Sequence, residues 1–294
     1  MLNATITSMI QLLARTGSLL IVGLLLIYLA KRLFQSSIAL PSHAELSHKD
    51  NPALSTLFSA FLLATGIAAS GSFFGHWQDP IASAALKMLP EGLLAIVLLR
   101  ASIWINDYSI LSDFSITKEI GEDRNLGVSI TVAASTLASG MIINGALTGY
   151  SPNYAAGLRD LVVYWTLGQS LLVVAGMVFR RIKQYDVHRL LEYDDNPAVG
   201  WSFGGYLVGI GIVVRGATIG SGLSTLVNEL WHTVLLSLIG CTLLTVLHQT
   251  APRIILSGID LREEVEMNRN TAVGIPMACL TIALAIFIAE LIKR

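Results

Sequence analysis

The tetrapeptide Asp50-Asn51-Pro52-Ala53 recurs 145 residues later as Asp195-Asn196-Pro197-Ala198. The same offset carries Ile110-Leu111-Ser112 onto Ile255-Leu256-Ser257, and Arg124-Asn125 onto Arg269-Asn270. One unbroken offset across three separate blocks indicates that the chain arose by duplication. We therefore expect two domains of the same architecture, residues 1–150 and residues 151–294.

A finer repeat lies within each half. Four asparagines stand 74, 71 and 74 residues apart, at Asn51, Asn125, Asn196 and Asn270. Asparagine is a preferred helix N-cap, and proline after Asn51 and Asn196 suits the first helical position. We expect each asparagine to cap a helix, although a helix N-terminus can also bind an anion.

Small residues follow each asparagine at fixed offsets. Counted from the asparagine, positions 2, 9, 13, 20 and 24 are glycine or alanine in the first three quarters. At about 100° per residue these positions share one helix face, and position 15 lies on roughly the opposite face. In lipid, small residues let helix backbones approach closely, so both faces predict helix packing. A sharper hypothesis is that the four faces surround a common axis and line a narrow path. The predicted packing glycines are Gly71, Gly75, Gly145, Gly149, Gly216 and Gly220.

The composition is that of a polytopic membrane protein. Hydrophobic residues make up 53% of the chain and charged residues 13%, against about 25% charged in a soluble domain. The mean hydropathy is +0.66, and the net charge of −1 offers no footprint for nucleic acid. We expect an all-α fold with eight transmembrane helices, built as two parallel four-helix repeats or four pseudo-equivalent helix hairpins. The predicted spans are 9–34, 52–74, 82–105, 125–149, 160–180, 197–220, 227–249 and 270–291, and the start of the third, interrupted by Pro90, could be interfacial.

The connections predict the orientation. An even number of helices per repeat makes all repeats point the same way, related by an axis along the membrane normal. The longer connections and their flanking helix ends hold 12 of the 19 lysines and arginines, so we expect these loops in the cytoplasm. Both termini would then lie outside, in the periplasm, although Lys293 and Arg294 count against this.

Each half resembles a YjfL-like protein, a bacterial inner-membrane family known as a domain of unknown function. The resemblance rests on the asparagine-led helix starts and on the lead-ins Lys118-Glu119-Ile120 and Glu263-Glu264-Val265. It implies four helices per domain, an inner-membrane location and a role in envelope maintenance beside peripheral membrane proteins. It brings no catalytic residues. In the fourth quarter Glu290 and Arg294 replace glycines, which departs from the pattern.

Charges inside membrane spans are the remaining candidates for function, because burying them in lipid is costly. They are Glu91, Arg100, Arg215, Glu229 and Glu290. Arg215 should lie about 28 Å along its helix, where it could pair with one of the carboxylates. The alternatives are a structural or snorkelling charge and a gating or proton-linked role. We interpret Arg100 as a snorkelling arginine and His248 as a hydrogen-bonded core histidine.

Catalytic and metal motifs are missing from the sequence. There is no nucleotide-binding glycine loop, zinc-peptidase motif, serine nucleophile elbow or paired-cysteine motif. Cys241 and Cys279 lie in apolar runs, and His43, Glu45 and His48 share one loop that we interpret as solvated. We expect no metal, no cofactor and no enzymatic activity. The favoured function is a scaffold that docks a peripheral protein on segments 106–124 and 250–269. The alternatives are a channel or transporter for an ion or small cation and an intramembrane enzyme, and the chain could form a homo-oligomer.

Overall fold

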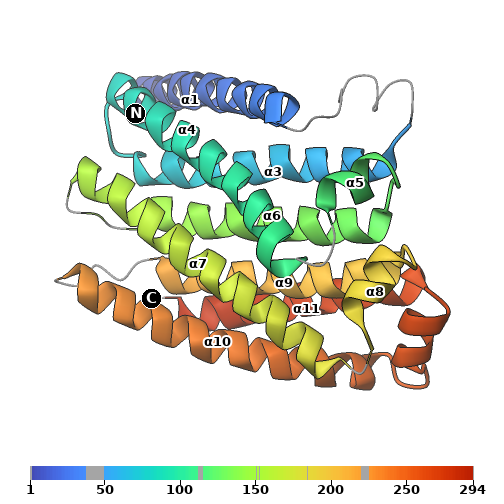
Figure 1. Ribbon diagram of the computed structural model, residues 1–294. Helices are drawn as coiled ribbons and strands as arrows, with labels where there is room; N and C mark the ends of the chain where they lie inside the picture. The colour runs from blue at the N-terminus through green and yellow to red at the C-terminus, as the bar shows by residue number, and fades with distance from the viewer. Residues whose placement is uncertain are drawn as a thin grey trace.

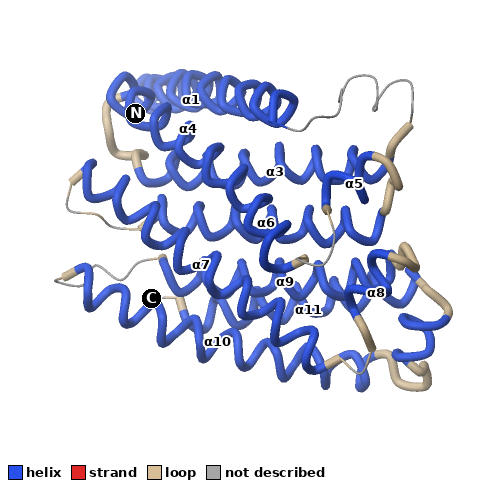
Figure 2. Tube along the Cα trace, viewed as in Figure 1, coloured by secondary structure: helices blue, strands red, loops and turns tan. Residues whose placement is uncertain are grey.

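The computed structural model describes residues 2–37, 50–111, 115–149, 151, 153–183, 185–219 and 225–293. Within these residues the secondary structure is helical, and Figure 2 shows no strand in them. The long helices are α1 (Leu2–Ser37), α3 (Pro52–Gly75), α4 (Ile81–Ile105), α6 (Leu126–Thr148), α7 (Tyr154–Ile182), α9 (Pro197–Thr218), α10 (Leu226–Ile255) and α11 (Thr271–Ile292). Shorter segments are α5 (Ile116–Gly121), α8 (Val187–Glu192) and two π-helical turns, η1 (Asn106–Ile110) and η2 (Glu263–Met267).

Eight helices of the described residues are long and apolar enough to cross a membrane. The predicted all-α class and the eight spans are confirmed, and the chain is a multi-pass membrane protein. The α4 helix runs unbroken through Pro90, so the proline does not interrupt the third span, and an interfacial start of this span stays a prediction. Packed neighbours let a membrane helix continue past the backbone hydrogen bond that a proline removes. The fifth span also begins earlier than predicted, at Tyr154.

The four asparagine-led helices form a row in the order α3, α6, α9, α11, each packed along its neighbour (Figure 1). The remaining long helices cover the grooves of this row. The α4 helix contacts α3 and α6, α7 contacts α6 and α9, and α10 contacts α9 and α11. The α1 helix lies at the α3 end, against α3 and α4. The hypothesis of a common axis is therefore wrong: α3 and α11 lie at opposite ends of the row.

At several contact positions the helices of the row lie closer together than any side chain larger than that of glycine would allow. A methyl group added to Gly211 would lie 2.6 Å from Ala138 Cα, and one added to Gly216 would lie 2.9 Å from Ala289 Cα. The same holds for Gly140, whose added methyl group would meet Ala64 Cα at 2.9 Å. Carbon atoms normally pack 3.5–4.0 Å apart, so only glycine fits at these positions.

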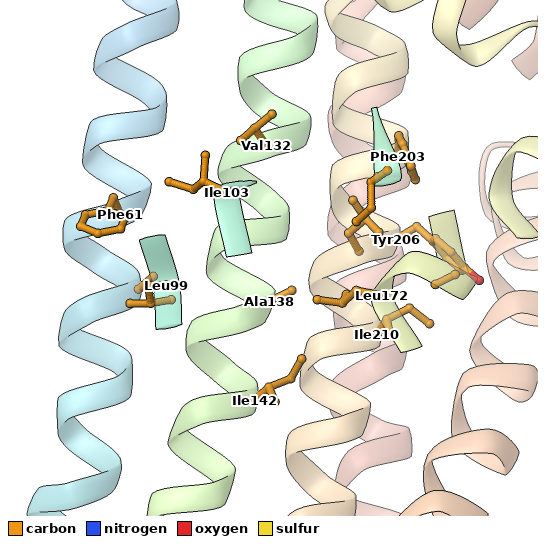
Figure 3. Packing of buried hydrophobic residues seen from close by; sticks show 14 of the residues in the cluster. Phe61, Leu99, Ile103, Val132, Ala138, Ile142, Leu172, Phe203, Tyr206 and Ile210 are labelled. Atoms are coloured by element: carbon orange, nitrogen blue, oxygen red, sulfur yellow. The ribbon is translucent and has the colours of Figure 1, made fainter. Parts of the chain in front are cut away.

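The apolar core lies where the covering helices cross the row. Figure 3 shows Phe61 of α3 near Leu99 of α4, Ile142 on the side of α6 that faces α9, and Leu172 and Phe203 farther along the row. These five side chains are fully buried. Large exposed apolar residues gather on α1 and α10, as expected of helices facing lipid. Examples that are 49–66% exposed are Leu20, Leu24, Leu238 and Val246.

Candidate functional site

The four asparagines lie at one end of the row, which we call the asparagine end. Each side-chain oxygen accepts a backbone N–H of its own helix, as Asn51 does from Leu54 at 3.0 Å. The side-chain nitrogen then donates to the segment before the next helix of the row. Asn51 donates to the Ile120 carbonyl at 2.9 Å, and Asn196 donates to the Val265 carbonyl at 2.7 Å. Each asparagine of this kind therefore joins two successive quarters as well as capping a helix.

Asn125 and Asn270 add a carboxylate to the same arrangement. Asn125 donates to the Leu191 carbonyl at 2.6 Å and also to Glu119 at 3.0 Å. Asn270 belongs to the last helix of the row and donates to Glu264 of its own quarter at 2.7 Å. The lead-in glutamates of the sequence motif thus hold the cap asparagines in place.

The residue before each asparagine adopts a left-handed backbone conformation that the sequence analysis did not anticipate. The φ angles are 47° at Asp50, 56° at Arg124, 47° at Asp195 and 50° at Arg269. Non-glycine residues adopt this region at a cost of roughly 1–2 kcal/mol. Its recurrence in all four quarters shows one conserved turn geometry feeding each helix of the row.

Arg215 bonds to an amide rather than to one of the predicted carboxylates. Its Nε donates to Asn144 Oδ1 at 2.6 Å, and the Asn144 amide nitrogen donates to Ser70 Oγ at 3.0 Å. All three residues occupy position 19 after their asparagines. They form a polar series across α9, α6 and α3 near the end of the row opposite the asparagines, which we call the opposite end.

Glu91 belongs to a polar cluster at the opposite end. It is 5% exposed, accepts a hydrogen bond from Ser72, and lies 2.9 Å from His76 Nε2. Asp79 bridges His76 and Lys87 at 3.0 and 2.8 Å. The cluster lines a cavity of 280 Å³ between the α3–α4 turn and the start of α7. Because Lys87 donates to Asp79, the pKa of that carboxyl is lowered.

The other predicted residues are dispersed. Arg100 lines a 60 Å³ cavity with Asp107, and Glu229 is buried in the first turn of α10. Glu290 is exposed on α11, 3.7 Å from Lys293 Nζ. Five of the predicted packing glycines lie against a neighbouring helix of the row, namely Gly71, Gly75, Gly145, Gly149 and Gly216. Gly220 and the loop holding His43, Glu45 and His48 lie outside the described residues.

A basic cavity of 420 Å³ opens at the asparagine end of the second half. It lies between the end of α7, the end of α10 and the segment leading to η2. Its charged and polar lining residues are Lys183, Tyr185, His248, Gln249, Arg253, Asp260 and Arg262. Val265 also lines it, and the Val265 carbonyl is the acceptor for Asn196. The cavity is thus built onto the network of cap asparagines.

The cavity holds more positive than negative charge. Arg262 bonds to Glu266 at 2.8 Å, whereas no carboxylate of the described residues forms an ion pair with Lys183 or Arg253. Burial, with the nearby Arg253 charge, lowers the pKa of Lys183 to about 8. A bound anion would neutralise these two cations, and it would raise that pKa.

His248 lies at the deep side of the cavity, inside the span of α10. Its Nδ1 lies 2.9 Å from Thr281 Oγ1, while its buried Nε2 has no partner in the described residues. The ring lies near Phe179 and Tyr206, with centroids 5.6 and 5.2 Å away, and Lys183 Nζ sits 4.9 Å above Phe179. The interpretation of His248 as a hydrogen-bonded core histidine therefore holds for the Nδ1 nitrogen and not for the Nε2 nitrogen.

Sequence reasoning missed this cavity, although a signal was present. At the offset of 145 residues, His248 stands where the first half has Ile103, and Arg253 stands where it has Tyr108. Polar replacements in only one of two duplicated halves mark where that half has specialised. Among the described residues no group of three or more His, Cys, Asp or Glu side chains could hold a metal ion. The cations Lys183 and Arg253, which line the cavity, suit it to anion binding.

A family model described as Domain of Unknown Function (DUF350) matches residues 8–147 and again residues 153–292. No curated protein and no solved structure matches the chain.

Proposed function

The chain belongs to the DUF350 family, a domain of unknown function that it carries in two tandem copies, and from this premise we propose that it is a non-enzymatic membrane scaffold. The scaffold holds an anionic group of a peripheral protein in the basic cavity of its second half. We place it in the bacterial inner membrane, with the asparagine end in the cytoplasm and the termini in the periplasm.

The observation that carries this proposal is the pair of unpaired cations in an open cavity. Lys183 and Arg253 meet no carboxylate of the described residues, so an anionic side chain from outside would complete them. A volume of 420 Å³ lies within the range of small-ligand pockets, about 300–1,000 Å³. That space accepts one or two acidic side chains of a docked segment. The segment 250–269, predicted as a docking region, supplies one wall.

Close packing of the row supports binding over transport. The packing glycines of α6 and α9 lie against backbone atoms of the neighbouring helix, which leaves no room for an ion between these helices. Catalysis has no support from the cavity either, because its cations are not accompanied by a nucleophile paired with a base.

The test is binding of an acidic probe to the purified protein in nanodiscs of zwitterionic lipid. The probes are a fluorescent oligo-glutamate peptide and inorganic phosphate. We expect peptide affinity to fall at least tenfold in Lys183→Ala and Arg253→Ala. It should be unchanged in Lys118→Ala, whose side chain is exposed on α5 and near Asp123. Equal binding by all variants would refute the cavity as the docking site.

A channel or transporter for an ion or small cation is the second candidate, and the opposite-end cavity favours it. Asp79 and Glu91 line that cavity and would attract a cation. The test is flux of potassium or a polyamine into proteoliposomes, with Glu91→Gln as the variant. Flux that is lost in Glu91→Gln would replace the scaffold proposal, whereas peptide binding without flux would support it.

A further inference from the structure

The three contacts along the row are one interface used three times. Position 13 of each helix meets position 15 of the next helix. A methyl group added to Gly140, at position 15 of α6, would lie 2.9 Å from the Cα of Ala64, at position 13 of α3. A methyl group added to Gly211 of α9 would likewise lie 2.6 Å from the Cα of Ala138 of α6. The third instance is Gly209, whose added methyl would lie 3.3 Å from Ala285 Cβ. Two different faces meet each time, so the interface is heterologous, and within one chain the row stays open at both ends.

Three further pairs of positions repeat in the same way. Position 20 meets position 19 in Gly71 with Asn144, Gly145 with Arg215, and Gly216 with Ala289. Position 9 meets position 8 in Ala134 with Gly204 and in Gly205 with Ala278. Position 2 meets position 4 in Gly127 with Gly200 and in Ala198 with Gly274. The leading face of one helix, holding positions 2, 9, 13 and 20, therefore always meets the trailing face of the next, holding positions 4, 8, 15 and 19.

A heterologous row must end with one unused half-interface on each side. On α11 the leading face is exposed, with Ala272, Cys279 and Ala283 open to the surroundings. On α3 the trailing face is open: Ser59 is exposed, and a methyl group added to Gly66 would meet nothing within 4 Å. The two open faces are the two halves of the contact that the chain makes internally three times.

We propose that a second copy of this chain completes the row, with α11 of one copy packed against α3 of the next. Small residues drive helix association in lipid because they allow close backbone contact. The pairs expected are Cys279 with Ser59 and Ala283 with Gly66. The contact would form either a closed ring or an open filament in the plane of the membrane.

The position of α1 agrees with a missing neighbour. The α4, α7 and α10 helices each lie over a groove between two helices of the row, whereas in the described residues α1 packs against α3 at the end of the row. The α11 helix of another copy would supply the second wall of that groove. It would also cover part of α1, where Leu20 and Leu24 are 60 and 66% exposed.

Glu290 makes the fourth contact different from the other three. It occupies position 20, which is glycine in α3, α6 and α9, so its side chain holds the two copies apart near Ser70 of the next copy. The copies therefore approach most closely toward the asparagine end. This gradient separates the proposed interface from random collision of helices in the membrane.

Cysteine cross-linking in native membranes tests the proposal. In a Cys241→Ala background, Ser59→Cys would face the natural Cys279 of the next copy. Copper(II) phenanthroline removes two electrons and two protons from the thiol pair, forming a disulfide that needs Cβ atoms roughly 3.5–4.5 Å apart. We expect a ladder of dimers and larger species on non-reducing gels. The matched control is Val246→Cys, which is 50% exposed on α10 and should give little product with Cys279.

A second series tests the gradient. With Cys279 and Cys241 both replaced by alanine, Gly66→Cys with Ala283→Cys should cross-link efficiently, and Ser70→Cys with Glu290→Cys should cross-link weakly. Gly66 and Ala283 are at open faces, so thermal melting of the Gly66→Cys, Ala283→Cys protein in detergent should match that of its cysteine-free parent, which separates assembly from folding. Ser70→Cys also removes the acceptor of Asn144, so its cross-linking is compared only at equal folded protein. Ala283→Trp should shift the native mass in nanodiscs toward the 31.6 kDa monomer.

Two results would overturn the proposal. One is cross-linking of Ser59→Cys no stronger than that of Val246→Cys. The other is a dimer band formed through Cys279 alone, without the Ser59→Cys change, because that band indicates a symmetric dimer. Assembly and peptide binding use different surfaces, so failure of one leaves the other standing.

Discussion

Replacing Gly216 by alanine tests whether close backbone contact holds the row together. The new methyl group would lie 2.9 Å from the Cα, Cβ and O atoms of Ala289. Carbon atoms pack at about 3.5–4.0 Å, so α9 and α11 must separate by about 0.6–1.1 Å at this level. Overpacking of this kind costs about 1–3 kcal/mol.

Alanine also has a higher helix propensity than glycine, and that gain of up to about 1 kcal/mol must be measured separately. Gly23→Ala is the matched control, because a methyl group added to Gly23 in the middle of α1 meets nothing within 4 Å. The control should be neutral or stabilising. The corrected loss at Gly216 should be about 1–3 kcal/mol.

The assay is thermal unfolding in detergent at a fixed scan rate, followed by tryptophan fluorescence. For a chain of this size, 1 kcal/mol corresponds to about 2–4 °C in Tm. We expect Gly216→Ala to melt roughly 2–12 °C below the control Gly23→Ala, and Gly216→Leu to fold poorly. The reasoning is refuted if Gly216→Ala and Gly23→Ala shift the melting temperature equally.

Three further predictions concern polar groups. Arg215→Gln should preserve stability, because the glutamine amide nitrogen takes the place of the arginine Nε. Arg215→Leu should lose about 1–3 kcal/mol of unfolding free energy, because it leaves the Asn144 side-chain oxygen without its donor. Equal melting temperatures of the two variants would contradict this prediction. Asn196→Asp keeps the helix cap but sets a buried carboxylate oxygen against the Val265 carbonyl, which the amide nitrogen now bonds. Thermal unfolding should therefore show a loss of at least about 1–3 kcal/mol although the cap is retained, and a melting temperature equal to that of the parent protein would contradict this. Lys183 carries its charge below a pKa of about 8, so peptide titrations at pH 7 and 9 should show affinity falling as the pH rises; Lys183→Arg stays charged and should bind equally at both values.

Much of the architecture is local in origin and was therefore predictable. The length of the apolar runs determines the eight spans, and an asparagine followed by a small residue determines each helix start. The small residues on two faces of each helix predicted close contact from two sides, which Gly140 and Gly145 make with α3 and α9. None of these features depends on how distant parts of the chain meet.

The arrangement of the helices and the basic cavity depend on such meetings. A helix with two small faces fits equally well in a ring or in a row, and only the rotation of each helix against its neighbour decides between them. The basic cavity joins Lys183, which follows α7, with His248 and Arg253 of α10. These residues share one cavity only because the end of α7 lies beside the end of α10. The sequence by itself thus determined which segments cross the membrane and in which relative direction, because hydrophobic length and helix parity are properties of the chain alone. The tertiary structure decided which faces touch and which charges gather, because packing in lipid selects among contacts that the same small residues permit.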